Sequence, residues 1–129
     1  MPQKAILIVD DSSLARMLLK NIVTQAFPHW LIVEAPNAEA CLEKIKTQPV
    51  AAALLDFNMP GINGIDLAAK LMESDPKMSI HLVTANIQDM MRQRAEAMGI
   101  GFIKKTRIQR RHRKNSWPPR WRTLTYGIN

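Results

Sequence analysis

The sequence has a single cysteine and no long apolar run. Cys41 is the only thiol in 129 residues, so no disulfide can form within the chain, and a reducing compartment is expected. No apolar stretch approaches the roughly 20 residues of a membrane span. The apolar run near Met1 ends at Asp10, too early for the core of a signal peptide. These absences predict a cytoplasmic protein that has no membrane partner.

Acidic residues are missing altogether from residues 106–129. Residues 1–105 carry 11 Lys or Arg and 11 Asp or Glu, so this part of the chain is neutral overall. The formal net charge of +7 therefore comes entirely from the cations of the last 24 residues. This positive charge is a property of a tail, so it does not indicate that residues 1–105 bind nucleic acid.

Short apolar runs alternate with amphipathic segments over residues 5–103. We expect strands over residues 5–9, 31–33, 51–55, 79–83 and 102–103. The segments between them have apolar residues at helical spacing. In order, these residues are Leu14, Met17, Leu18 and Ile22; Ala38, Cys41, Leu42 and Ile45; Ile65, Ala68, Leu71 and Met72; and Ile87, Met90, Met91, Ala95 and Met98.

Polar residues and one glycine mark the ends of these helices. Ser12 or Ser13 is placed to cap the first helix and Asn37 the second, because their side-chain oxygens can accept bonds from free backbone N–H groups. Gly99 is a C-terminal signal for the last one. Strict alternation with short links predicts an α/β fold with a doubly wound parallel sheet and helices on both faces.

Chemically active side chains directly follow the expected strands. Asp10 and Asp11 follow the first strand, Asp56 the third, Thr84 the fourth and Lys105 the fifth. Sites in open parallel sheets form beyond the carboxyl ends of the strands, so these side chains are expected to meet at one rim. Carboxylates packed together repel, and a divalent cation that takes oxygen ligands, such as Mg²⁺, relieves that repulsion. An aspartate beside Mg²⁺ can act as a nucleophile toward phosphorus.

Each of these residues has a plainer interpretation when it is taken alone. Asp10 and Asp11 suit the positive end of a helix dipole and could simply begin a helix. Asp56 before a turn could be ordinary turn chemistry, and Thr84 or Lys105 alone indicates nothing. The joint arrangement at the strand ends is what favours phosphoryl transfer.

The chain resembles the receiver domain of bacterial response regulators and is nearest in size to the single-domain chemotaxis type. The matching motifs are IVDDS (residues 8–12), LLDFNMPGING (54–64), VTA (83–85) and GFIKK (101–105). The resemblance covers residues 4–105, about four-fifths of the chain. It implies a five-stranded, flavodoxin-like parallel sheet of order 2-1-3-4-5.

The resemblance also implies a role for each residue at the rim. Asp56 would be the phosphoacceptor. Mg²⁺ would be held by Asp11, Asp56 and the backbone carbonyl of Asn58, with Asp10 contacting the metal through water. Thr84 would bond a phosphoryl oxygen, Lys105 would pair with the phosphoryl group, and Phe102 would stand at the aromatic switch position.

A signalling switch is therefore the leading functional interpretation. A sensor histidine kinase or a histidine phosphotransfer protein would donate the phosphoryl group, and a downstream protein would bind the strand 4–helix 4–strand 5 face. A phosphatase that works through a phosphoaspartate is disfavoured, because Asn58 stands where such an enzyme commonly has a second aspartate. The alternative is a fragment of a nucleic-acid-binding regulator that acts through the basic tail.

The chain departs from the family after residue 105. Thr106 replaces the usual proline, and residues 106–129 show no apolar stripe for a fifth helix. We therefore divide the chain into a receiver domain, 1–105, and an atypical basic tail, 106–129. One set of codons for residues 106–117, read one base later, gives Pro-Val-Ser-Lys-Glu-Asp-Ile-Glu-Lys-Ile-Ala. This motivates the hypothesis that the tail is a frameshift product, and that the domain self-associates through the flank left uncovered.

Overall fold

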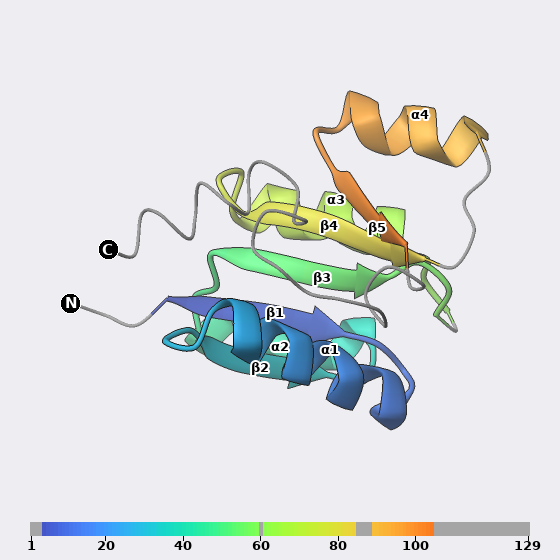
Figure 1. The fold of residues 1–129 in the computed structure, drawn as a ribbon. Coiled ribbons are helices and arrows are strands. Elements are labelled where there is room, and N and C mark those ends of the chain that lie inside the picture. The colour runs from blue at the N-terminus through green and yellow to red at the C-terminus, as the bar shows by residue number, and fades with distance from the viewer. Residues whose placement is uncertain (1–3, 60, 85–88, 105–129) are drawn as a thin grey trace.

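The computed structural model describes residues 4–59, 61–84 and 89–104, in which strands and helices alternate (Figure 1). None of the helices described there is long and apolar enough to cross a membrane. In chain order the elements are β1 (Ala5–Val9), α1 (Ser13–Ala26), β2 (Leu31–Ala35), α2 (Ala38–Thr47), β3 (Ala52–Asp56), α3 (Gly64–Ser74), β4 (Ser79–Thr84), α4 (Asp89–Ala97) and β5 (Gly101–Lys104).

The five strands form one parallel sheet of order β2-β1-β3-β4-β5. This confirms the predicted α/β fold, its doubly wound parallel sheet and its strand order. The expected absence of a regular fifth helix concerns residues 106–129, which lie outside the described residues. Because all strands run the same way, their carboxyl ends share one edge of the sheet, and the site should lie there.

Helices cover both faces of the sheet (Figure 1). On one face, buried residues of α1 pack with Ile6 and Ile8 of β1. On the other face, α2, α3 and α4 contribute residues to a core that contains Leu7 and Leu55. β1 and β3 are buried along their whole lengths, which is why their sequences are continuous apolar runs and not alternating ones.

Asparagine or serine side chains cap α1, α2 and α3. Ser12 Oγ accepts from the backbone N–H of Ala15 at 3.2 Å, so the cap of α1 is the first of the two predicted serines. Asn37 Oδ1 caps α2 at 2.8 Å, as predicted, and Asn63 Oδ1 caps α3 at 2.9 Å. Gly99 has a φ of 78°, the left-handed conformation expected of a residue that follows a helix.

The exposed side of α1 differs from the prediction. The sequence predicts a core-facing stripe that includes Leu14 and Met17, yet these side chains are 60% and 50% exposed. The buried stripe is formed by Leu19, Ile22 and residues one turn further along. A helix advances about 100° per residue, so Leu14 and Met17 lie on the opposite side from Leu19. The helix carries two apolar stripes, and helical spacing alone does not distinguish them.

The methionines of α4 divide between the core and the surface. Met91 and Met98 pack against the core around buried Ala95, as the predicted stripe requires. Met90 does not follow that prediction, because it is 81% exposed. Ile87, the first member of the predicted stripe, lies outside the described residues.

Cys41 is a core residue of α2. Its side chain is fully buried, and burial raises the pKa of the Cys41 thiol from 9.0 to about 11. The thiol is therefore protonated at neutral pH and buried away from solvent, which fits a packing role.

Candidate functional site

Three carboxylates gather at the carboxyl ends of β1 and β3. Asp56 is the last residue of β3, and Asp10 and Asp11 follow β1. The parallel register pairs Val9 with Leu55, so the next residues of the two strands, Asp10 and Asp56, are neighbours. One carboxylate oxygen of each aspartate lies within 4.8 Å of those of the other two. Asp10 and Asp56 are buried, with 1% and 3% exposure, whereas Asp11 is exposed.

The chemistry of this aspartate group suits a hard divalent cation. Its donors are all carboxylate oxygens, which Mg²⁺ prefers over nitrogen or sulfur. Three like charges within this distance repel, and two of them are buried, so a bound cation would offset a large electrostatic cost. The exposed carboxylate of Asp11 leaves one side of the group open to solvent. The residues present therefore fit an Mg²⁺ ion.

Of the other predicted residues, Thr84 lies at the same edge, Asn58 follows the end of β3, and Phe102 lies within β5. Asn58 is exposed, two residues beyond Asp56. Thr84 is the last residue of β4 and is buried, one position past the residue that pairs with Asp56. Phe102 is half-buried on β5, one strand further from the aspartates. Lys105 lies outside the described residues, directly after the end of β5.

Arg16 lies at this site, although it is not among the residues predicted from the sequence. Its Nη1 donates a hydrogen bond to the backbone carbonyl of Asp10 at 2.6 Å. Arg16 lies one helical turn after the Ser12 cap, and helical side chains lean toward the N-terminus of their helix. That spacing is a signal that could have indicated Arg16, because it directs a long cationic side chain back toward the aspartates.

The loop that follows Asp56 is fixed at both ends. The backbone N–H of Phe57 donates to Val83 O at 3.1 Å, and the N–H of Gly64 donates to Phe57 O at 3.0 Å. Gly64 begins α3 so close to β3 that a Cβ atom there would lie 2.9 Å from Asp56 O and 3.0 Å from Phe57 Cα. The absence of a side chain at Gly64 therefore sets the position of the loop beside Asp56.

Gly64→Ala is expected to lower the free energy of unfolding by about 1–3 kcal/mol, the usual cost of overpacking. The nearest atom is Leu82 Cδ2 at 2.8 Å, which belongs to a fully buried side chain, and the other two belong to the backbone and cannot rotate aside. Helix propensity alone predicts the opposite sign, because alanine normally stabilises a helix relative to glycine by about 0.5–1 kcal/mol. Urea denaturation followed by circular dichroism measures the difference. Glu73→Ala, at an exposed position of the same helix, is the control, and a Gly64→Ala protein as stable as its parent would contradict the packing.

Two arginines of α4 connect this helix to its neighbours. The Arg92 guanidinium lies 5.5 Å from the ring centroid of Phe102 on β5, in a cation–π contact. Arg94 Nη2 lies 3.1 Å from Asp66 Oδ1 on α3. Both pairs are at the surface, so their electrostatic contributions are small. They nevertheless connect α4 to the strand that bears Phe102 and to the helix that follows the Asp56 loop.

The model of the response regulator receiver domain family matches residues 6–114. That range spans most of the chain, and the chain belongs to the response regulator receiver domain family. The matched range continues past Lys105, the predicted boundary between receiver domain and tail, and that boundary stays a prediction.

Comparisons with individual proteins agree with this family. The chain is 38% identical to the chemotaxis protein CheY of Thermotoga maritima over 88 residues, which cover 68% of this chain and 72% of CheY. It is 28% identical to the sensor protein EvgS of Escherichia coli over 96% of this chain, but it spans only 11% of EvgS. A solved CheY-like response regulator receiver domain protein from Methanospirillum hungatei superposes with a TM-score of 0.73 at 26% identity, covering 98% of this chain and 91% of that one.

Proposed function

We propose that this chain is a phosphoacceptor switch in which Asp56 takes a phosphoryl group in the presence of Mg²⁺. The observation that carries the proposal is the gathering of Asp10, Asp11 and Asp56 oxygens within 4.8 Å at the carboxyl edge of the sheet. Asp56 is the member of this group that ends a central strand and precedes a loop fixed at both ends. Membership of the receiver family supports the same role.

The transfer needs few groups from the protein. A carboxylate oxygen of Asp56 would form a bond to phosphorus while the P–N bond of a donor phosphohistidine breaks, and the imidazole would keep the electron pair of that bond. The products are an acyl phosphate on Asp56 and a free histidine. Thr84 ends the neighbouring strand, where its hydroxyl would donate to a phosphoryl oxygen, and Lys105 would pair with the same group.

A bound Mg²⁺ would offset the negative charge that accumulates between the nucleophile and the phosphoryl oxygens. Asp11, Asp56 and the backbone carbonyl of Asn58 would hold it, and Asp10 would contact it through water. The open side of the group at Asp11 suits a cation that keeps some of its water ligands.

The phosphodonor would be a sensor histidine kinase or a histidine phosphotransfer protein. The similarity to a segment of the sensor protein EvgS supports a place in such a signalling chain. The output would be a downstream protein bound to the β4–α4–β5 face, where Phe102 is half-buried and Met90 is exposed. Phosphorylation would act by shifting this face, and the chain would not be an enzyme that turns over a separate substrate.

Removal of Mg²⁺ tests the proposal. The protein incubated with Mg²⁺ and acetyl phosphate should gain one phosphoryl group, measured by intact mass spectrometry. EDTA should reduce the phosphorylated fraction to background, and excess Mg²⁺ should restore it, because the cation neutralises charge in the transition state. Circular dichroism with EDTA controls for unfolding. Equal phosphorylation with and without EDTA would rule out the metal-dependent mechanism.

A further inference from the structure

Arg16 and Glu34 form a connected pair beside the aspartate group. Arg16 Nη1 donates to the Asp10 carbonyl at 2.6 Å, and Arg16 Nε lies 3.5 Å from Glu34 Oε1. The Arg16 side chain is only 18% exposed, and that of Glu34 is 35% exposed. One guanidinium therefore joins the edge strand β2 to the turn between β1 and α1, and neither residue has a role in the proposed transfer.

The bonded carbonyl belongs to the peptide group that joins Asp10 to Asp11. Both carboxylates extend from the two ends of this one peptide plane, so a bond that fixes the plane limits the directions in which both can point. A second bond, from the N–H of Ser12 to Asp10 Oδ1 at 2.9 Å, fixes the carboxylate itself. A charge-assisted bond such as the one from Arg16 is stronger than a neutral one and is sensitive to geometry.

Glu34 is itself held in place. Lys20 Nζ lies 3.4 Å from Glu34 Oε2, and Lys44 Nζ donates to the backbone carbonyl of Glu34. Glu34 lies on β2 opposite Ile8, two residues before Asp10. The Glu34 carboxylate binds Nε of Arg16, and this orients the guanidinium so that Nη1 points at the Asp10 carbonyl. A lysine in place of Arg16 would offer only a single point charge.

We propose that Arg16 is a positioning residue for the cation site, held by Glu34, and that it presets the directions of the Asp10 and Asp11 carboxylates. This inference rests on the proposed function. It also predicts that replacing Arg16 changes the Mg²⁺ affinity in the direction opposite to the one expected from charge alone. Removing a positive charge near three carboxylates should strengthen cation binding if charge alone matters. Removing a residue that orients the ligands should weaken it, as loss of an outer-shell partner usually does.

Isothermal titration calorimetry of the full chain with MgCl₂ separates these two effects. Arg16→Gln is expected to raise the Mg²⁺ dissociation constant about tenfold, the lower end of the effect of losing an outer-shell partner. Arg16→Lys should recover part of the affinity, and Glu34→Gln should show a smaller loss than Arg16→Gln. Lys20→Gln is the charge control: it removes the same charge from the other oxygen of Glu34 but leaves both bonds of Arg16 in place, so any loss of affinity should be smaller than in Glu34→Gln.

The outcomes separate this inference from the function on which it rests. Mg²⁺ binding by Arg16→Gln that is unchanged, or tightened to the same degree as in Lys20→Gln, would overturn the positioning role while leaving the proposed function intact. Failure of the parent protein to bind Mg²⁺ would overturn both. Thermal unfolding of each variant without metal shows whether a loss of affinity reflects a loss of fold, and the Arg16→Lys variant keeps the charge if Arg16→Gln is unstable.

Discussion

Asp56→Asn is expected to abolish phosphorylation by acetyl phosphate, with a loss on the order of 100-fold or more, since removing a nucleophile commonly costs at least that much. The amide nitrogen is a poor nucleophile because its lone pair is delocalised, and the amide oxygen carries no full charge. Asparagine has nearly the same shape as aspartate, so packing at this buried position should not change. Intact mass spectrometry after incubation with Mg²⁺ and the donor measures the phosphorylated fraction.

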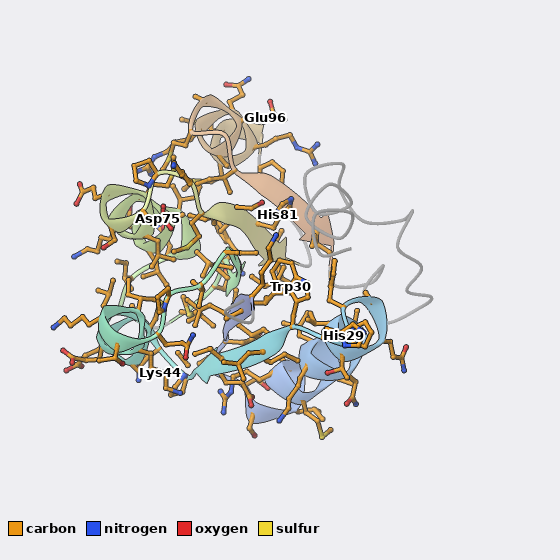
Figure 2. The ribbon with its side chains drawn as sticks, turned by 90° about the vertical axis from the view of Figure 1, so that its left-hand side faces the viewer. His29, Trp30, Lys44, Asp75, His81 and Glu96 are labelled. Atoms are coloured by element: carbon orange, nitrogen blue, oxygen red, sulfur yellow. The ribbon has the colours of Figure 1, made fainter. Side chains whose placement is uncertain are left out.

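The control for this substitution is Glu96→Gln. Glu96 is an exposed residue of α4, labelled in Figure 2, and it does not belong to the aspartate group. Its replacement removes one negative charge and should leave phosphorylation unchanged. Asp56→Asn should fold at least as well as the parent, because it removes one of three repelling carboxylates. Phosphorylation of Asp56→Asn at the parental level would mean that another residue is the acceptor.

Gly101→Ala is expected to lower the free energy of unfolding by about 2–3 kcal/mol, the upper part of the usual range for overpacking. Gly101 on β5 pairs with His81 on β4, and a Cβ atom at this glycine would lie 2.5 Å from His81 Cδ2 and 2.6 Å from Nε2. His81 is 1% exposed, and Figure 2 shows it on the same side of the sheet as Trp30. Its ring is enclosed and has little room to move away from an added methyl group.

Two further variants show whether this loss arises from the histidine ring. In Gly101→Ala combined with His81→Ala, the new methyl group fills part of the space left by the ring, so the double variant should lose less stability than the sum of the single losses. A Cβ atom at Gly99 would meet no atom within 4 Å, but this residue has a φ of 78°. Gly99→Ala should therefore lower the free energy of unfolding by about 1–2 kcal/mol through backbone strain alone. Fully additive losses in urea denaturation would contradict the contact between Gly101 and His81.

The parallel sheet and the aspartates at its edge could be predicted from local patterns in the sequence, whereas the strand order came only from the resemblance to receiver domains. A strand buried on both faces gives a continuous apolar run, as in β1, and the residue that follows such a run must lie at the edge of the sheet. Parallel strands bring these residues to one edge of the sheet, and the pairing of β1 with β3 then places Asp10 beside Asp56. The end of the edge strand β2 was harder to predict. The apolar run ends before the charged Glu34, but backbone pairing with β1 continues the strand to Ala35.

Contacts that depend on side-chain direction could not be predicted in the same way. Leu14 and Ile22 both have helical spacing, yet only the side of α1 that meets the sheet is buried, and the sequence does not say which of two apolar stripes this is. The Arg16 bond to Asp10 depends on the conformation of one long side chain. The pairing of His81 with Gly101 depends on the register of two strands separated by a helix.

Mapping the phosphorylated residue tests the central claim most directly. Borohydride reduces an acyl phosphate to an alcohol, so a phosphorylated aspartate becomes homoserine, which peptide mass spectrometry locates in the sequence. The protein is first incubated with Mg²⁺ and acetyl phosphate and then reduced. We predict homoserine at position 56 and unmodified aspartate at positions 10 and 11. Homoserine at either of those two positions with intact Asp56, or no homoserine in a protein that has gained a phosphoryl group, would contradict the assignment of Asp56 as the phosphoacceptor.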